Sequence, residues 1–368
     1  MDMERLRALA EHCQQVSHHN AGYPCNQAID FSPVLPLFHY NLNNLGDPFS
    51  GSSYRANTHE FEREVLAFFA DLLKLQGDYR GYVASCSTEG NFYGISLGIQ
   101  RYPDAVLYFS ESAHYSLPKT ARLTRTPYEK IRSLPTGEMD YRDLAQALAK
   151  HPNRPAVINA TLGTTMTEAS DNLAEINRVL AEQGIVDFHL HVDAALSGII
   201  LPFCERADAF NFTQTIHSYC ISGHKFLGTP MPCSVALSRQ TISAEHVEYA
   251  NLEDSTIGGS RNAHASLLLW YAIQVLGKAG IERWVNHCLA MTDYALAQLT
   301  DAGIAAWKNP CATTLIFPKP SEAFVKEWWL LTEGQQAHWV IKSNTDKAWV
   351  DRFVGVLQRD SAISSDQS

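Results

Sequence analysis

The sequence lacks the features that mark membrane-spanning, secreted and nucleic-acid-binding proteins. No apolar run approaches the ~20 residues needed to cross a bilayer, and residues 1–5 (MDMER) lack the basic and apolar stretches of a signal peptide. Lysine- and arginine-rich runs are missing too, and the formal net charge is −10, so the acidic surface would repel phosphate backbones. We therefore expect a cytoplasmic protein with neither a membrane nor a nucleic-acid partner.

Paired cysteines are also missing, because none of the eight cysteines belongs to a C-x-x-C pair. In a chain of 368 residues this scatter indicates reduced thiols and not a disulfide framework. The composition, 45% hydrophobic and 18% charged, can build a large core. The length suggests a large catalytic domain and a smaller one. The cysteines are Cys13, Cys25, Cys86, Cys204, Cys220, Cys233, Cys288 and Cys311.

Residues 80–240 alternate between short apolar strands and helical stretches. Helical periodicity over residues 173–183 ends at Gly184, a typical residue for the end of a helix. This alternation indicates an α/β fold with a mostly parallel sheet, and ligands of such sheets bind beyond the carboxyl ends of the strands. The predicted strands cover residues 106–109, 157–160, 188–192, 219–221 and 234–237.

The flanking segments differ in character from this central region. The first is an irregular arm whose apolar part is expected to pack on another surface, such as a second subunit. A helix capped by Asn57 and Glu60 follows, and two later helices are predicted over residues 263–276 and 281–299. The expected segments are the arm at 1–56, the large domain at 57–300, a small α+β domain at 301–360 and a disordered tail at 361–368.

A lysine follows directly after one predicted strand, within residues 222–225 (SGHK). In a partly desolvated pocket the pKa of such a lysine falls, which frees its amine to form an imine. Ser222 and His224 can then bind a phosphate or hold the imine in place. The alternative is a surface-loop lysine, so Lys225 needs its structural context.

An aspartate ends another predicted strand, within residues 191–195 (HVDAA). Its carboxylate can pair with a protonated pyridine nitrogen, and the neighbouring alanines leave room for a flat ring. The alternative is a cap for the next helix. Because one strand–helix–strand excursion separates Asp193 from Lys225, we expect both at the same edge of the sheet.

Small hydroxyl residues precede a predicted helix in residues 85–91 (SCSTEGN). Free backbone N–H groups at such a helix start bind anions, so a phosphate would fit there, although an ordinary N-cap would have the same sequence.

His114 follows the strand at 106–109 and can stack on a cofactor ring or serve a structural role. His189 and His191 alternate on one strand without a third ligand nearby, so we expect no metal.

Together these motifs resemble the group II pyridoxal-phosphate-dependent amino-acid decarboxylases, most of all the short bacterial histidine decarboxylases and the plant serine decarboxylases. The resemblance extends from Gly22 into the C-terminal domain and keeps the family's order. The matching blocks are residues 43–47 (NNLGD), 88–91 (TEGN), 112–116 (SAHYS), 163–165 (GTT), 191–195 (HVDAA), 222–225 (SGHK), 230–233 (PMPC) and 259–262 (GSRN).

The resemblance implies an aspartate-aminotransferase-type fold (fold type I), pyridoxal 5′-phosphate as the cofactor, and a homodimer with its site at the subunit interface. It implies that Lys225 forms a Schiff base with the cofactor, that Asp193 pairs with the pyridine nitrogen and that His114 stacks on the ring. The other implied contacts are Ser87 and Thr88 at the phosphate, Ser222 and His224 on the lysine side, and Ala195 under the ring.

The chain departs from the family pattern at several positions near the expected pocket. Cys86 and Ser87 replace two glycines, Arg55 replaces an apolar or small residue, and Ala263 replaces a glycine. If Arg55 faces the pocket, it favours an acidic or strongly polar substrate. The remaining candidate substrate contacts are Tyr23, Ser260 (reaching the partner's site) and Tyr249, which with His114 is a candidate proton donor to Cα.

The resemblance implies a carboxy-lyase that releases CO₂ and an amine from an L-amino acid. Histidine is the first choice of substrate, serine the second, and another small polar or acidic amino acid follows. The alternatives are an aminotransferase, an aldehyde-forming decarboxylase and a non-catalytic homologue. Arg352 and Arg359 lie on the predicted last helix or just beyond it, and neither lies in a convincing loop, which disfavours the carboxylate grip of an aminotransferase.

Overall fold

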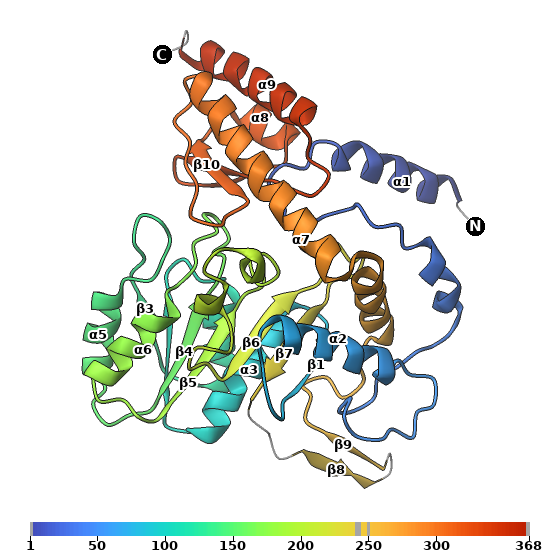
Figure 1. Cartoon of the computed structure of the whole chain (residues 1–368), viewed down its shortest axis with the longest axis vertical. Helices are drawn as coiled ribbons and strands as arrows, with labels where there is room; N and C mark the ends of the chain where they lie inside the picture. The colour runs from blue at the N-terminus through green and yellow to red at the C-terminus, as the bar shows by residue number, and fades with distance from the viewer. Residues whose placement is uncertain (1–2, 240–243, 249–250, 366–368) are drawn as a thin grey trace. The chain divides into compact units, whose positions relative to one another are not determined.

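The computed structural model describes residues 3–239, 244–248 and 251–365 (Figure 1). They form two compact units, one made by Cys25–Asn286 and the other by Met1–Pro24 with His287–Ser368. The predicted division at residues 56 and 300 differs from this one. The backbone of Ala21 is hydrogen-bonded to Trp328 and Val340 of the C-terminal segment, so the start of the arm belongs to the smaller unit.

Within the described residues, no helix has the length and apolar character for a membrane span.

A seven-stranded sheet forms the centre of the large unit, in the order β1-β7-β6-β5-β4-β2-β3. Strands β6, β5, β4, β2 and β3 are parallel, and β7 pairs antiparallel with β6 and β1. The mostly parallel sheet and every predicted strand are confirmed. The strands are β1 (Arg80–Ala84), β2 (Val106–Ser110), β3 (Tyr128–Ile131), β4 (Ala156–Thr161), β5 (Phe188–Asp193), β6 (Ser218–Ser222) and β7 (Ser234–Ser238).

The same unit contains the helices that connect and cover these strands (Figure 1). The predicted helix before Gly184 is confirmed as α6. The helical elements are η1 (Ser32–His39), α2 (His59–Leu72), α3 (Ser87–Arg101), α4 (Ser116–Thr124), α5 (Tyr141–Ala149), α6 (Leu173–Glu182), η2 (Leu201–Phe203) and η3 (Ala207–Phe210), and a hairpin pairs β8 (Glu245–Val247) with β9 (Leu252–Asp254).

The predicted cap of helix α2 is wrong. The N-cap residue is Thr58, which makes no side-chain capping bond. Its Oγ1 donates instead to the carbonyl oxygen of Ala263 at 2.9 Å, a tertiary contact that the local sequence does not reveal. Oδ1 of Asn57 accepts a hydrogen bond from the N–H of His59 at 3.2 Å, and not from the N–H of Glu60 as the predicted capping box requires.

The two helices predicted after residue 262 are confirmed as two segments of α7 (Ala263–Asp301), which meet at Gly277. There φ is 57° and ψ is 174°, a non-helical conformation that glycine adopts at little cost.

Helix α3 packs closely across β5, β6 and β7. Gly90, Gly94 and Gly98, spaced one helical turn apart, face the sheet. A Cβ atom at Gly94 would lie 2.2 Å from Nδ1 of His191, and one at Gly98 would lie 2.7 Å from Cβ of His189. Because these glycines add no side chains, α3 lies directly on the side chains of the sheet, and its first turn reaches the carboxyl ends of β5 and β6.

Replacing Gly94 with alanine should lower the free energy of unfolding by about 1–3 kcal/mol, the usual cost of overpacking a core. The new methyl group would have to displace the buried ring of His191. Urea unfolding would measure the change. The control is Gly355→Ala in α9 (Lys347–Ser365), where a Cβ would meet only Nη1 of Arg359, at 3.8 Å. Equal losses in both variants would contradict the steric explanation.

The smaller unit is an α+β assembly with an aromatic core. The sequence after Gly303 predicts a strand at 313–317, a helix, a strand at 338–341 and a helix at 347–357, and this order is confirmed with one further short strand. Rings of Trp339 and Phe353 lie 4.2 Å apart between centroids, and Trp328 lies 4.9 Å from Phe353. The elements are α1 (Met3–Ser17), β10 (Thr314–Pro318), α8 (Glu322–Glu327), β11 (Leu331–Glu333), β12 (Gln336–Val340) and α9, with sheet order β10-β12-β11.

Helix α9 extends to Ser365, so it includes the first part of the segment predicted to be disordered. The last residues of that segment, 366–368, lie outside the described residues.

Candidate active site

A cavity of about 300 Å³ lies where the parallel strands end and α3 begins. Its walls come from the ends of β4, β5 and β6, from the first turn of α3 and from the loops that follow β2 and β6. Every residue predicted to contact a cofactor lines this one cavity, as the topology of a parallel sheet predicts. They are Ser87, Thr88, His114, Asp193, Ala195, Ser222, His224 and Lys225.

Lys225 is held in a loop whose backbone is fixed by Asn26 of the N-terminal arm. The N–H of Asn26 donates to the carbonyl oxygen of Lys225 at 3.2 Å, and Nδ2 of Asn26 donates to that of Phe226 at 3.1 Å. A Cβ at Gly228, where φ is +69°, would lie 2.2 Å from the carbonyl oxygen of Asn26, so this approach requires glycine. Burial lowers the pKa of Lys225, and the charge of Asp193 opposes that shift.

Asp193 is a buried carboxylate, 3% exposed, at the end of β5. Its Oδ2 accepts a hydrogen bond from Nδ2 of Asn91 at 2.7 Å, and its Oδ1 accepts one from the N–H of Ala195 at 3.1 Å. Among the described residues the structure contains no ion pair for this carboxylate. A buried negative charge without a cation is costly, so a ligand that presents a protonated ring nitrogen fits the site.

The first turn of α3 offers an anion site next to the lysine loop. The N-cap residue, Cys86, makes no side-chain capping bond, so the leading N–H groups remain available to a phosphate. Oγ of Ser87 lies 2.5 Å from Oγ of Ser222, which adds hydroxyl groups on the lysine side. Both carboxylate oxygens of Glu89 already accept hydrogen bonds, one from Tyr82 and one from the N–H of Ser85.

The two cavity histidines are held by local contacts. Nδ1 of His114 accepts from the N–H of Ser116 at 3.3 Å and lies 2.8 Å from its Oγ, so the neutral ring carries its proton on Nε2. Nδ1 of His224 lies 3.0 Å from the carbonyl oxygen of Cys233 and 3.2 Å from its backbone nitrogen. Burial lowers the pKa of both histidines, so both rings are neutral near pH 7.

Comparison with known protein families decides the identity of this site. The profile described as "Pyridoxal-dependent decarboxylase conserved domain" matches residues 100–305. The chain belongs to the pyridoxal-dependent decarboxylase family. The predicted family, carboxy-lyase chemistry and pyridoxal phosphate as cofactor are thereby confirmed. The lysine, the unpaired buried carboxylate and the anion site at α3 fit that cofactor.

Relatives cover nearly the whole of this decarboxylase. The histidine decarboxylase of Acinetobacter baumannii (strain ACICU) is 39% identical over 96% of this chain and 94% of its own. Serine decarboxylase 3 of rice (Oryza sativa subsp. japonica) is 37% identical over 95% of this chain and 81% of its own. The crystal structure of L-methionine decarboxylase from Streptomyces sp. 590 superposes with a TM-score of 0.87 at 24% identity, covering 99% of this chain and 96% of that one. This match confirms the predicted fold type.

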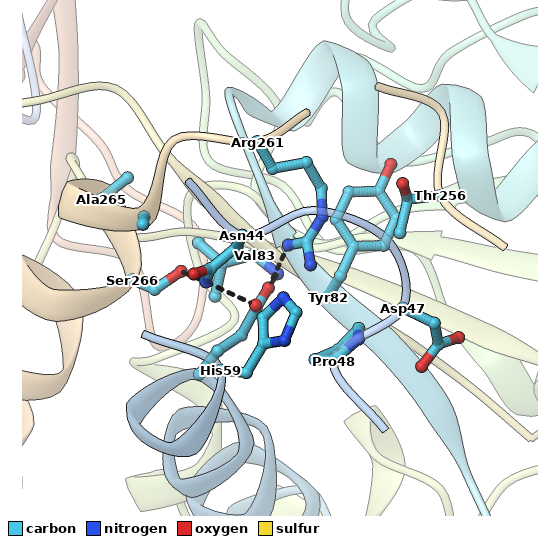
Figure 2. Close-up of polar contacts among 12 residues, drawn as sticks. Asn44, Asp47, Pro48, His59, Tyr82, Val83, Thr256, Arg261, Ala265 and Ser266 are labelled. Carbon is cyan, nitrogen blue, oxygen red and sulfur yellow. Dashed lines mark hydrogen bonds and ion pairs between the residues drawn. The ribbon is translucent and has the colours of Figure 1, made fainter. Parts of the chain in front are cut away.

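A buried ion pair joins several segments of the large unit away from the cavity lining (Figure 2). The side chains of Arg261 and Glu62 are 3% and 0% exposed, and Nη1 of Arg261 donates to Oε1 of Glu62. Glu62 also accepts hydrogen bonds from the N–H of Val83 and the amide of Asn44, each at 2.7 Å. The guanidinium of Arg261 lies 5.1 Å from the centroid of the Tyr82 ring. This cluster ties the arm, α2, β1 and the segment before α7 together.

Replacing Arg261 with methionine should destabilise the protein by about 3–5 kcal/mol, because it leaves the Glu62 carboxylate buried without its cation. Chemical denaturation would measure the loss. In the double variant Arg261→Met, Glu62→Gln the charge is gone, and the glutamine oxygen can still accept from Val83. We expect it to recover at least half of the lost stability; a double variant no more stable than the single one would refute this explanation.

The predicted substrate contacts do not join the cavity within this chain. Arg55 and Ser260 are exposed and are not among its described lining residues, and Oγ of Ser260 accepts from the Asn43 amide at 3.3 Å. Tyr23 belongs to the smaller unit, where its ring meets that of Trp329 edge-on at 6.4 Å. Tyr249 lies outside the described residues.

Sequence reasoning missed other residues of the cavity. Asn91, which contacts Asp193, was noted only as part of a matching block, although its position one turn after Ser87 on α3 was a usable signal. Thr161 and Thr165 also line the cavity and had no predicted role. His191, considered only as a metal ligand, hydrogen-bonds to Asn91.

Proposed function

We propose that this enzyme converts L-histidine to histamine and CO₂. Relatives named histidine decarboxylase and serine decarboxylase are about equally similar, at 38–39% and 37–39% identity. The bacterial histidine decarboxylases match over 91–94% of their own length, against 73–81% for the rice enzymes, which supports histidine. L-serine is the alternative, and another small polar or acidic amino acid comes next.

The observation that carries the site assignment is that Lys225 and Asp193 line the same cavity. Lys225 attaches the cofactor covalently, and Asp193 contacts its ring nitrogen. Bound pyridoxal phosphate supplies an electron-accepting ring for the pair of electrons left when CO₂ departs. The remaining roles are stacking by His114, phosphate contacts by Ser87, Thr88, Ser222 and His224, and support of the ring by Ala195.

The protein's part in the reaction is orientation and control of charge. The cavity has to hold the Cα–carboxylate bond of the substrate perpendicular to the cofactor ring. It must also keep cations from that carboxylate, because a salt bridge would stabilise the ground state. No arginine is among the described residues that line the cavity, in keeping with decarboxylation. His114 is our candidate proton donor to Cα, with Tyr249 as the alternative.

Transamination is less well supported than decarboxylation. Arg352 and Arg359 both lie on helix α9, and the guanidinium of Arg352 sits over the ring of Trp328, 5.9 Å from its centroid. Neither arginine belongs to a loop of the kind that grips a substrate carboxylate.

We further propose a cytoplasmic homodimer with the site at the subunit interface. The arm exposes large apolar side chains, with Leu35 58%, Phe38 40% and Tyr40 63% exposed in the single chain, and burying such a patch favours association. In this assembly Ser260 reaches the partner's site, and Tyr23 and Arg55 contact the substrate. Light scattering coupled to size-exclusion chromatography would test the dimer.

A screen of the common L-amino acids tests the substrate. Each reaction would be assayed for CO₂, amine and keto acid together, with Lys225→Ala as the blank. Histamine and CO₂ in equal amounts from histidine, at the highest kcat/KM of the set, is the expected result. A higher value for serine would reassign the substrate, and keto acid without CO₂ would make the enzyme an aminotransferase.

A further inference from the structure

Beneath the cavity, a chain of buried side chains leads from Asp193 into the interior of the sheet. Nδ2 of Asn91 donates to Oδ2 of Asp193 at 2.7 Å. Nε2 of His191 lies 3.0 Å from Oδ1 of Asn91, and its Nδ1 lies 2.8 Å from Oγ of Ser218. Nε2 of His189 lies 2.9 Å from the same Oγ. These side chains, on α3, β5 and β6, are all at most 3% exposed.

The chemistry of each group gives this chain a single direction. A carboxylate only accepts, so Asn91 turns its amide nitrogen to Asp193 and its oxygen to His191. Nε2 of His191 must then carry the proton, and its bare Nδ1 accepts from the hydroxyl of Ser218 at 2.8 Å, a shorter contact than the 3.4 Å between that hydroxyl and the carbonyl oxygen of Gly94. The oxygen of Ser218 in turn accepts from Nε2 of His189. Burial lowers the pKa of His191 to about 3, so the ring stays neutral.

We propose that Asn91, His191 and Ser218 are positioning residues that form a one-way relay of neutral donors aimed at Asp193. The relay fixes the orientation of the carboxylate and solvates it without supplying a positive charge. A lysine or arginine in the place of Asn91 would neutralise the carboxylate and compete with the ring nitrogen for it. Neutral donors in series polarise one another, so they strengthen the hydrogen bond to Asp193. They do not cancel its negative charge, which stays available to pair with the ring nitrogen. This inference rests on the proposed role of Asp193.

The close packing of α3 makes the relay possible. A Cβ at Gly94 would lie 2.2 Å from Nδ1 of His191 and 3.0 Å from Oγ of Ser218. Any larger residue would push the helix away from β5 and lengthen the contact between Asn91 and His191. The glycines of α3 therefore allow the contact between Asn91 and His191. They also hold the start of the same helix, with its anion site, close to the sheet.

The direction of the relay can be tested without cofactor. In ¹⁵N NMR spectra of the cofactor-free protein, assigned with single histidine variants, His191 should be neutral and protonated on Nε2, and His189 should carry a proton on Nε2. Ser218→Ala should change the ¹⁵N shifts of His191, because Nδ1 loses its donor. A His191 ring protonated on Nδ1, or on both nitrogens, at neutral pH would overturn the relay.

Cofactor affinity supplies the second readout. Asn91→Leu keeps the approximate volume but removes a hydrogen bond to a charged group, so the dissociation constant of pyridoxal phosphate should rise about 10- to 100-fold. Ser218→Ala, which does not touch Asp193, should raise it several-fold and shift the absorption band of the bound cofactor. Should Asn91→Leu not fold, Ser218→Ala carries the test alone.

The matched control is Ser234→Ala on β7, which removes another fully buried hydroxyl outside the relay. It should leave the His191 shifts and the cofactor affinity unchanged. If Ser218→Ala and Ser234→Ala behave alike, the relay is refuted even where Asp193→Asn abolishes turnover. If Asp193→Asn itself has no effect, the proposed role of Asp193 fails instead.

Discussion

Replacing Lys225 with alanine should remove the absorption band of covalently bound cofactor and lower kcat at least about a thousandfold. The reason is that Lys225 has the only amine among the described residues that line the cavity, and burial lowers its pKa toward the nucleophilic neutral form. Absorption spectra of the purified variant, before and after adding pyridoxal phosphate, would measure the first effect. CO₂ release would measure the second.

A lysine outside the site provides the control for this variant. The side chain of Lys278 is 60% exposed and lies 4.0 Å from Asp71. Lys278→Ala should keep both the absorption band and the turnover. Borohydride trapping followed by peptide mass spectrometry should place the cofactor on Lys225 in the wild-type protein. A trapped cofactor on any other lysine would exclude Lys225 as the attachment site.

Replacing Asp193 with asparagine should leave partial cofactor binding but lower kcat on the order of 10²- to 10³-fold, the usual effect of losing one preorganised electrostatic contact at a reacting centre. The variant removes the negative charge that the ring nitrogen needs. It also sets an amide group against donors from Asn91 and Ala195, one of which loses its acceptor. Kinetics at saturating pyridoxal phosphate separate the catalytic loss from weaker binding.

Asp171 is the control for losing a buried carboxylate. It is fully buried and accepts hydrogen bonds from the N–H groups of Met139 and Thr161, and burial raises its pKa to about 7. Asp171→Asn should alter stability but leave the spectrum of the bound cofactor unchanged. Near-normal turnover of Asp193→Asn would rule out the electron-sink role of Asp193.

Each of the two strands of the central sheet that sequence analysis missed has its own local reason. Strands β2, β4, β5, β6 and β7 are almost completely buried and rich in apolar residues, although polar residues interrupt β4 and β5. Strand β3, at the edge of the sheet, is half exposed and carries charged residues. Strand β1 begins with Arg80 and Gly81, which weakens its apolar pattern. The sequences of β1 and β3 therefore look like loop sequences, and only pairing with a neighbouring strand shows that they are strands.

The residues proposed to contact the cofactor were predicted to share one cavity and do, whereas the positions of the proposed substrate contacts were not predictable, for one physical reason. Lys225, Asp193 and Ser87 sit at fixed places relative to a strand end or a helix start, so local sequence determines where they go. Arg55 and Ser260 lie in irregular segments, whose path depends on distant contacts such as that of Ser260 with Asn43. In the single chain both are exposed, away from the cavity.

The sequence by itself determined the fold class, the family, the cofactor and eight of the residues that line the cavity, because each follows from local periodicity or from a motif within a few residues. Only the tertiary structure decided the hydrogen bonds of Asp193 and the buried pair of Arg261 and Glu62. Those contacts join segments far apart in the chain. The contact between Asp193 and Asn91 depends on how closely α3 approaches the sheet at Gly94, a distance that local sequence does not encode.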